Sequence, residues 1–547
     1  MKDNYNHFKL TDENGEIIRN NRGDKGSNGM VATARLEASK IGIDIIKSGG
    51  NAIDAAVAVG FALGVCEPNA SGLGGGGFMT IRLGDSGETI FLDFREVAPA
   101  LANPSMWQID DNGDVIGDEK SQGGKSICVP GEVAGLISAL ENYGTMTLED
   151  VLKPAIQLAE DGFIVSDMFK RDIDNYRNKL LEYEEKGNVF LNDYKVGDKI
   201  TNKPLADTLR KISEEGTNGF YKGAVADRII KSIQKHSGIM AIEDLENYGV
   251  NELKPMRGTY RGYEIISSPP PSSGGTHIIQ ILNILENFDI SSYEVNSTEY
   301  MHIFSEIFKM CFADRLEYMG DPNFAYVPIN GLISKQYAKR LARKIDMDKA
   351  NKYGYDYPID FEPTDTTHYS IGDKDGNMVS VTKTISAFFG SGVVPEDTGI
   401  VLNCQMRGFA LGEGKANSVG PNKKPLSSMS PTIILKDNKP FAVLGSPGGN
   451  RIITTVAQVI SKLIDHNMNI EDAINSPRIS NYVDGIMLYE SRISSDSIAK
   501  LRNMGHDVEM LSEYDRKLGG VQGIKYNDEM IIKGAADPRR DGVAIGY

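Results

Sequence analysis

The stretch that decides the fold reads Thr366-Thr367-His368-Tyr369-Ser370-Ile371, Lys374-Asp375-Gly376-Asn377, Met378-Val379-Ser380-Val381-Thr382. Its two arms are rich in β-branched and hydroxyl-bearing residues, and the four polar residues between them are typical of a hairpin turn. The pattern therefore predicts two paired β-strands, with Thr366 opening the first of them.

The segment in front of this hairpin has a different character. Residues 348–365 are polar and rich in tyrosine and aspartate, with Pro358 and Pro363 among them. Exposed stretches of this kind are where a backbone is readily cut. A cut before Thr366 frees its α-amine, which is the base that an N-terminal threonine nucleophile needs to activate its own hydroxyl. An ordinary buried strand fits the same residues, so composition alone leaves both interpretations open.

Outward from the hairpin, apolar periodicity predicts further elements on both sides. Residues 1–30 are polar and glycine-rich, which indicates a weakly ordered entry or an edge segment. The elements predicted elsewhere are helices at residues 32–47, 51–66, 132–143, 148–160, 297–318 and 451–464, and strands at residues 78–82, 90–94, 432–435 and 441–444. Strands early, helices in the middle and strands late indicate sheets sandwiched between helices.

Composition argues against several classes of function. The chain has 547 residues, and its formal net charge of −16 repels nucleic acid and anionic membranes, so neither is an expected partner. The four cysteines form no CxxC pair, which favours reduced thiols, and the seven histidines show no metal-binding spacing. No apolar signal-peptide core precedes residue 22. We therefore expect a cytoplasmic protein, or an exported one if its N-terminus was trimmed.

The loop Gly72-Leu73-Gly74-Gly75-Gly76-Gly77 matches the GxGxxG pattern of dinucleotide-binding proteins. In those proteins the loop follows a strand and opens a helix, whereas here the predicted helix comes first. We therefore interpret these glycines as positions where the backbone passes close to another segment, and we expect no cofactor.

Three other segments carry groups suited to binding an anion. Residues 445–450, Gly-Ser-Pro-Gly-Gly-Asn, lie between a strand and a helix, where successive N–H groups can form an oxyanion hole. Residues 426–430 offer serine hydroxyls, and Arg95 follows a strand, where it can hold a carboxylate with two parallel bonds. Each also has a purely structural explanation: a strand–helix turn, a solvated loop, and an arginine paired with Asp93 or Glu96.

Joined in order, these segments resemble the gamma-glutamyltransferase (glutathione hydrolase) family of N-terminal nucleophile hydrolases from about residue 28 to the C-terminus. The matching motifs are Gly49 to Ala56, Gly72 to Gly77, Asp93 to Glu96, Asp314-Arg315, Thr366 to Ser370, Pro421 to Thr432, Gly445 to Gly449 and Ala536 to Arg539. The resemblance implies an α+β fold, a four-layer αββα sandwich of the N-terminal nucleophile hydrolase type.

The resemblance also implies a zymogen that cuts itself between Asp365 and Thr366. Residues 1–365 would then form a large subunit and residues 366–547 a small one, together making one catalytic unit. The implied activity is that of a hydrolase and acyltransferase of glutathione metabolism, with no cofactor and no metal. A small γ-glutamyl donor is cleaved, and water or an amine accepts the acyl group.

Individual roles follow from the matched positions. Thr366 matches the nucleophile, and Thr384 the threonine that orients it. Gly448 and Gly449 match the oxyanion-hole amides. The residues that match the substrate-binding set of the family are Arg95, Gln405, Ser427 and Ser428.

The chain departs from the family in the pocket for the donor's α-amino group. Typical members hold this group with an asparagine, a glutamine or glutamate, and an aspartate, and here those positions are Ser386, Gln405 and Gly408. Arg407 adds a positive charge where an ammonium would lie, and a buried ammonium without its carboxylate is costly. The stretch from Ala410 to Pro421 is short, which indicates that the flap of some relatives is missing.

Two alternatives to glutathione cleavage follow. The first keeps the chemistry but uses a donor without a free α-amine, either poly-γ-glutamate or a glutaryl amide. The second is a non-catalytic binding protein that keeps the fold and never matures.

Overall fold

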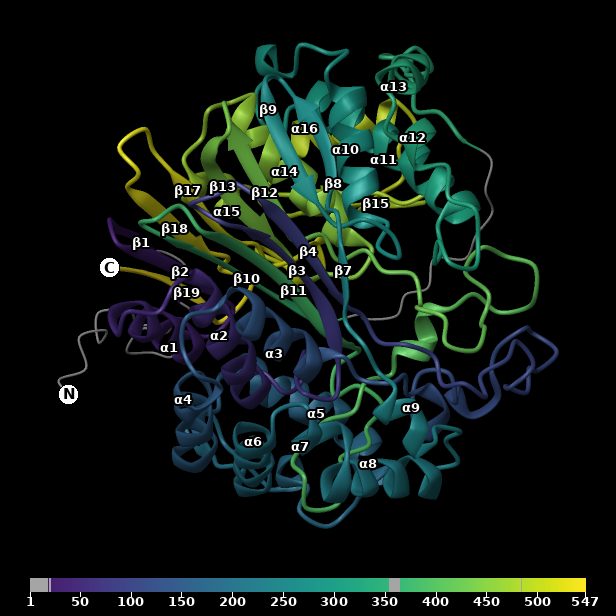
Figure 1. Cartoon of the computed structure of the whole chain (residues 1–547). Coiled ribbons are helices and arrows are strands. Elements are labelled where there is room, and N and C mark those ends of the chain that lie inside the picture. The colour runs from purple at the N-terminus through teal and green to yellow at the C-terminus, as the bar shows by residue number, and fades with distance from the viewer. Residues whose placement is uncertain (1–17, 19–20, 354–364, 484) are drawn as a thin grey trace.

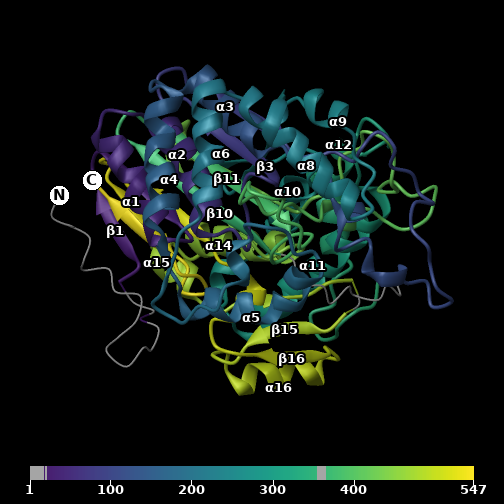
Figure 2. The same cartoon turned by 90° about the horizontal axis from the view of Figure 1, so that it is seen from below.

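Two antiparallel sheets of seven strands lie face to face at the centre of the molecule, and helices cover their outer faces (Figure 1). The computed structural model describes residues 18, 21–353, 365–483 and 485–547. Figure 2 shows the molecule from below, where helices overlap the central strands. This arrangement is the predicted four-layer αββα sandwich.

The central hairpin is longer than the sequence indicates. Its strands are β10 (Asp365–Asp373) and β11 (Met378–Ser386), and they lie in the middle of one sheet. That sheet runs in the order β19 (Val543–Gly546), β2 (Gly29–Thr33), β10, β11, β3 (Gly76–Arg82), β4 (Thr89–Phe94), β7 (Asn251–Leu253). Every residue of β11 is buried, because neighbouring strands, a helix layer and the second sheet surround it.

The second sheet draws its strands from both ends of the chain. Its order is β1 (Gly23–Gly26), β18 (Ile532–Ala536), β17 (Gln522–Tyr526), β13 (Lys439–Gly445), β12 (Thr432–Lys436), β9 (Tyr263–Ser267), β8 (Met256–Tyr260). Apolar side chains between the two sheets form a dry inner layer that includes Met30, Ile266, Met378, Val443 and Ile524. The edge strand β1 accounts for the last part of the predicted entry segment; residues 1–17 and 19–20 lie outside the described range.

Helices form the two outer layers. The layer on the β10 sheet contains α1 (Leu36–Lys47), α2 (Ala52–Cys66), α3 (Glu132–Tyr143), α4 (Leu148–Asp161), α5 (Asp167–Glu182), α6 (Lys203–Glu215), α7 (Asn218–Tyr221), α8 (Gly223–Lys235) and α9 (Ile242–Glu246). The opposite layer contains α10 (Gly274–Leu285), α11 (Thr298–Tyr318), α12 (Ile329–Leu332), α13 (Lys335–Ala342), α14 (Arg451–Ile464), α15 (Ile470–Asn475) and α16 (Ser495–Asn503). A small sheet of β14 (Ile479–Ser480), β15 (Met487–Glu490) and β16 (Val508–Leu511) lies beside them.

Helix α2 shows how local sequence and burial agree. The Asn51 side chain accepts a bond from the Asp54 amide at 2.9 Å, and Asp54 accepts one from the Asn51 amide at 2.8 Å. This reciprocal capping fixes the start of the helix, as the sequence predicts. All fifteen residues of α2 are buried, which explains its almost uniformly apolar composition.

One predicted boundary is wrong. Residues 29–33 form strand β2, and the first helix begins only at Leu36. Strand β2 pairs with β10 on one side and β19 on the other, so tertiary pairing outweighs the apparent helical period of these residues. Strands β8 and β9 and the C-terminal strands β17 to β19 are also absent from the predicted elements.

The glycine loop after α2 is confirmed as a place of close backbone approach. A Cβ on Gly75 would collide with the Thr384 carbonyl oxygen, and one on Gly74 with the Val401 carbonyl oxygen. The four cysteines are buried and free, as expected. Among the described residues, no helix combines the length and apolar character needed to cross a membrane.

Candidate active site

Thr366 is the second residue of β10 and lies beside Thr384 of β11. The Thr366 hydroxyl donates to the Thr384 hydroxyl oxygen at 3.3 Å, and Thr384 Oγ1 also accepts from the Ser386 amide at 2.8 Å. Both threonines are only 4 % exposed. A hydroxyl whose oxygen already accepts a backbone N–H is fixed in position, so Thr384 can orient its neighbour.

The pairing of β10 with β11 is irregular at Thr366, in the manner of a β-bulge. Asp365 pairs with Ser386 and Thr367 with Lys383, so two steps along β10 face three along β11, and the extra residue lies on β11. A bulge redirects a side chain that regular alternation would fix, and bulges are over-represented next to active sites. The peptide bond before Thr366 therefore lies at an irregular point of an otherwise regular, buried sheet.

The hydroxyl-rich strand behind Thr366 surrounds a buried histidine. His368 Nδ1 lies 2.8 Å from Thr382 Oγ1, and its Nε2 lies 3.0 Å from Ser370 Oγ. Burial lowers the pKa of His368 to about 3, so the ring is neutral at ordinary pH. A Cβ on Gly445 would collide with this ring, which shows how closely the end of β13 approaches β10.

The predicted oxyanion loop follows β13 and leads into α14. Gly448 and Gly449 have φ angles of 132° and 56°, a backbone conformation that favours glycine. Within the described ranges, neither amide donates a hydrogen bond to a protein acceptor. Two such amides directly before a helix N-terminus are well suited to bind a negatively charged oxygen.

Arg95 follows β4 and contacts the backbone that leads into the serine loop. Its guanidinium donates to Glu96 Oε2 at 3.0 Å and to the carbonyl oxygens of Pro425 and Leu426, each at 3.3 Å. The Glu96 pair is one of the two structural contacts that the sequence suggests for Arg95. Burial raises the pKa of Glu96, and the charge of Arg95 partly offsets that rise.

Ser428 connects the serine loop to the oxyanion loop. Its hydroxyl donates to Asn450 Oδ1 at 3.0 Å and accepts from Arg315 Nη2 at 3.1 Å. The Ser427 hydroxyl oxygen accepts from the Met429 amide at 3.1 Å. Arg315 thus joins the site as a second arginine; the Asp314-Arg315 motif is the only signal for it in the sequence.

Gln405 and Gly408 lie on a short 3₁₀ turn that Asn403 holds in place. Asn403 Oδ1 accepts from the Gln405 amide at 2.9 Å, and its Nδ2 donates to the Gly74 and Cys128 carbonyl oxygens at 2.7 and 2.8 Å. Gln405 Oε1 is buried and has no hydrogen-bond partner among the described residues. A Cβ on Gly408 would lie 3.1 Å from Gln405 Nε2. Sequence reasoning misses Asn403, because its role depends on contacts with distant segments.

Ser386 and Arg407 lie close to the same pocket. Ser386 ends β11 with a φ of 82°, which is uncommon for a serine. Nearby, Lys179 donates to the Phe388 and Gly390 carbonyl oxygens at 2.6 and 2.7 Å. Burial, together with the charge of Arg407, lowers the pKa of Lys179 to about 8. Lys179 and Arg407 thus bring two cations close together near the Gln405–Gly408 turn, with the Asp118 carboxylate also within electrostatic range of Lys179.

The structure also brings together a potential ligand set that sequence spacing does not indicate. Ligand atoms of His302, Glu306 and His506 all lie within 4.8 Å of one another. His302 Nδ1 lies 2.8 Å from His506 Nε2, and the Lys309 ammonium lies 2.6 Å from Glu306 Oε1. These hydrogen bonds satisfy the cluster without an ion.

Comparison with known proteins gives a consistent result. The gamma-glutamyltranspeptidase family model matches residues 38–547. The glutathione hydrolase proenzyme of Escherichia coli (strain K12) is 44 % identical over 542 residues, covering 96 % of this chain and 92 % of that protein.

Two solved structures are similar as well. The cephalosporin acylase from Bacillus halodurans superposes with a TM-score of 0.87 at 27 % identity, covering 99 % of each chain. The Helicobacter pylori gamma-glutamyltranspeptidase has a TM-score of 0.55 at 44 % identity, covering 58 % of this chain and 91 % of that one. With this sequence match over most of its length and the αββα sandwich described above, the chain belongs to the gamma-glutamyltranspeptidase family.

Proposed function

We propose that this chain is a self-processing N-terminal threonine hydrolase that cleaves γ-glutamyl amides such as glutathione through a threonyl acyl-enzyme. The observation that carries the proposal is the Thr366–Thr384 hydroxyl contact of 3.3 Å at the bulged start of a buried central strand. The relative from Escherichia coli, named a glutathione hydrolase proenzyme, supports both the processing and the substrate class.

Maturation uses the same hydroxyl as catalysis. Thr366 Oγ1 attacks the carbonyl carbon of Asp365, the bond to the Thr366 nitrogen breaks, and an ester replaces the peptide bond. Water then hydrolyses the ester, leaving a carboxylate on Asp365 and a free amine on Thr366. Residues 1–365 become the large subunit and residues 366–547 the small one. The bulge supports this step because it places the scissile peptide outside the regular ladder.

In the mature enzyme the α-amine of Thr366 takes the hydroxyl proton while Oγ1 attacks the donor's γ-carbonyl carbon. Thr384 orients the attacking oxygen. The amides of Gly448 and Gly449 stabilise the oxyanion, and removing one such donor typically costs about 3 kcal/mol. The α-amine then protonates the leaving amine, and water or an acceptor amine resolves the ester on Thr366.

The donor's α-carboxylate is held by Arg95 with Ser427 and Ser428. Arg95 is 2 % exposed, so a carboxylate beside it is shielded from water and interacts strongly. Arg315 positions Ser428, because its hydrogen bond to Ser428 Oγ fixes the hydroxyl that would contact the donor's carboxylate.

Among the donor's polar groups, the α-amine has the fewest protein groups to bind it. Gly408 supplies no side chain, Ser386 a short one, and Arg407 and Lys179 place two cations nearby. The buried Gln405 Oε1 is the one acceptor that the matched positions retain. We therefore propose that the preferred donor lacks a free α-amine or has it in an amide bond, as in poly-γ-glutamate or a glutaryl amide.

The loop of residues 410–418 supports an open site. It folds back on itself, with the Ala410 amide donating to the Asn417 carbonyl oxygen at 2.9 Å. The Asn417 side chain also bonds to the Gly408 carbonyl oxygen at 2.7 Å and the Leu426 amide at 3.0 Å. These bonds hold the short loop against the Gln405–Gly408 turn, and we propose that no longer flap covers the site.

Autocatalytic scission is the first prediction. Purified protein is expected to separate on a denaturing gel into fragments of residues 1–365 and 366–547, and N-terminal sequencing of the smaller one should begin Thr-Thr-His. Thr366→Ala should remain one chain, because a methyl group cannot attack the Asp365 carbonyl. A wild-type chain that stays whole after long incubation at neutral pH would instead support a binding protein that never matures.

The second prediction concerns Arg95. Arg95→Lys is expected to lower kcat/KM by about 10- to 100-fold, because one charge-assisted hydrogen bond contributes roughly 1.5–3 kcal/mol and an ammonium cannot reproduce the two-pronged grip. Scission should be unaffected.

Arg82→Lys is the matched control for this variant, since Arg82 also donates to a backbone carbonyl, that of Gly376 at 2.8 Å, at the other end of the sheet. If wild type and Arg95→Lys had the same kcat/KM on every donor, Arg95 would have only a structural role, as the ion-pair partner of Glu96.

Donor preference is the third prediction. The native enzyme should hydrolyse a glutaryl amide, which lacks the amine, at least as well as glutathione, measured as kcat/KM. Arg407→Asp combined with Gly408→Asp should shift that ratio toward glutathione by about 10- to 100-fold, since it supplies the missing charged bonds. A Cβ introduced at Gly408 would lie 3.1 Å from Gln405 Nε2 and 3.2 Å from Pro425 Cβ, so the end of the Gln405 side chain has to move slightly to admit the aspartate. A strong native preference for glutathione would show that other residues hold the ammonium.

A further inference from the structure

Helix α13 and the residue after it carry three exposed cations without carboxylate partners. Among the described residues, no carboxylate lies within 4.0 Å of Lys339, Arg340 or Arg343. By contrast, Lys335 in the first turn of the same helix pairs with Glu286 at 2.5 Å. In a chain with a net charge of −16, such a local excess of positive charge is available for an anionic ligand.

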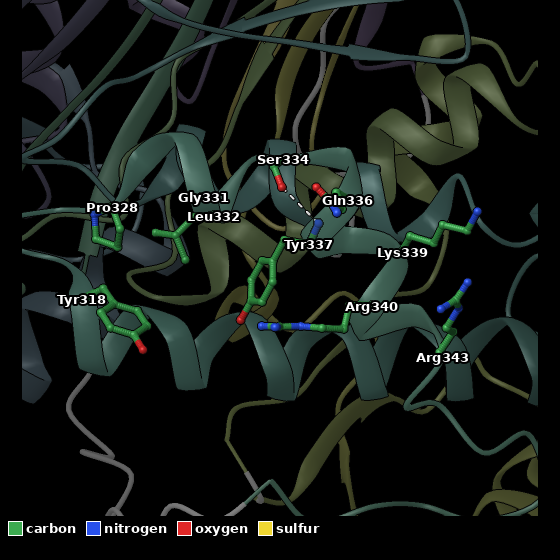
Figure 3. Close-up of a pocket in the computed structure, with 10 residues that line it drawn as sticks. All are labelled: Tyr318, Pro328, Gly331, Leu332, Ser334, Gln336, Tyr337, Lys339, Arg340 and Arg343. Carbon is green, nitrogen blue, oxygen red and sulfur yellow. Dashed lines mark hydrogen bonds between the residues drawn. The ribbon is translucent and has the colours of Figure 1, made fainter.

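These cations border a hollow of about 790 Å³ between α13, α12 and the end of α11, shown in Figure 3. Tyr337 points toward α11, where its hydroxyl donates to Asp314, 3.0 Å from each carboxylate oxygen. The Arg340 guanidinium lies 4.9 Å from the centre of the Tyr337 ring. The hollow thus combines an aromatic wall with a cationic rim.

Aromatic side chains continue from the hollow along the segment after α11. Tyr318 lines the hollow and is 41 % exposed, Phe324 is 49 % exposed and Tyr326 is 88 % exposed. Phe324 lies under the Lys423 ammonium, 5.5 Å from the centre of its ring. Exposed aromatic rings on this segment, together with the cations of the hollow, suit a ligand with both apolar and anionic parts.

This segment connects the hollow to the donor pocket. A Cβ on Gly320 would collide with the Ala416 carbonyl oxygen, and Asp321 accepts from the Lys424 amide at 2.9 Å. The neighbouring Asn417 bonds to both Gly408 and Leu426. On the same helix as Tyr318, Arg315 bonds to Ser428. The hollow therefore lies one loop away from the residues that hold the donor.

We propose that this hollow is a second binding site for the distal part of a long γ-glutamyl chain, whose pendant carboxylates meet Lys339, Arg340 and Arg343. The chemistry of the chain fits, because γ-linkage places methylene groups in its backbone and one carboxylate on each unit. The inference rests on the proposed function and narrows its donor to poly-γ-glutamate. The connection of this hollow to the donor residues favours a donor chain over a lipid surface, because Asn417 bonds to both Gly408 and Leu426.

The test compares two charge-matched variants of the mature enzyme. Lys339→Gln/Arg340→Gln/Arg343→Gln removes the cations of the hollow. Lys153→Gln/Lys203→Gln/Lys231→Gln removes the same charge from exposed lysines of α4, α6 and α8 that form no ion pair with described residues. Each is assayed for kcat/KM on poly-γ-glutamate and on a glutaryl anilide, at low and high salt.

The hollow variant is expected to lose about tenfold in kcat/KM on the polymer at low salt, with the anilide unchanged, because three exposed ion pairs of moderate strength are lost. High salt should remove most of the difference between wild type and variant. The control variant should behave as wild type.

Polymer hydrolysis that is equal in the hollow and control variants would overturn the second site while leaving the proposed function intact. A wild type that cleaves neither substrate would overturn the proposed function itself. Binding of the wild type to anionic phospholipid vesicles that is stronger than its binding to poly-γ-glutamate, and that the hollow variant loses, would overturn the polycarboxylate assignment.

Discussion

The proposed chemistry depends on one constraint: the hydroxyl of Thr366 has to lie beside that of Thr384 both before and after the proposed cut. A nucleophile at a free chain end would fray if nothing held it. Here β10 lies between β2 and β11 in the middle of the sheet, and the backbone that follows Thr366 is held by pairing with β11 from Thr367 onward and with β2 from Ser370 onward. The bulge at Thr366 then frees this one residue from the regular ladder.

The same constraint explains why the two proposed subunits are interleaved. Strands β10 and β11 of the small subunit pair with β2 and β3 of the large one. A fully buried ion pair also joins them, since Lys383 donates to Glu132 Oε1 at 2.6 Å next to Thr384. Separating the subunits would break these strand pairings and expose the buried faces of the sheets to water. Scission of one peptide bond therefore leaves the fold in place.

Much of this can be predicted from sequence where the signal is local. The turn at Lys374–Asn377 predicts the hairpin, and Asn51 predicts the start of α2, because both depend on neighbouring residues. The predicted helix start at Ala32 is wrong, because Ala32 and Thr33 belong to strand β2, whose pairing partners lie more than 300 residues away. The bulge at Thr366 also depends on strand register, which the hydroxyl-rich pattern does not encode.

The residues of the candidate site also fall into two groups: those that a local sequence motif indicates, and those that only the fold brings together. Thr366 and Arg95 lie in motifs that can be read along the chain, and the structure gives each a definite set of contacts. Asn403 has its function only through bonds to Gly74 and Cys128, which are distant in sequence. The cluster of His302 and His506 likewise forms only on folding.

The measurement that tests the account most directly is mass spectrometry of an acyl-enzyme trapped with an activated γ-glutamyl or glutaryl ester and then denatured. The account predicts one acyl group on the fragment that begins at Thr366, attached to the hydroxyl of that threonine and absent from residues 1–365. An acyl group on any other residue, or steady turnover by a variant in which Thr366 is replaced by alanine, would contradict it.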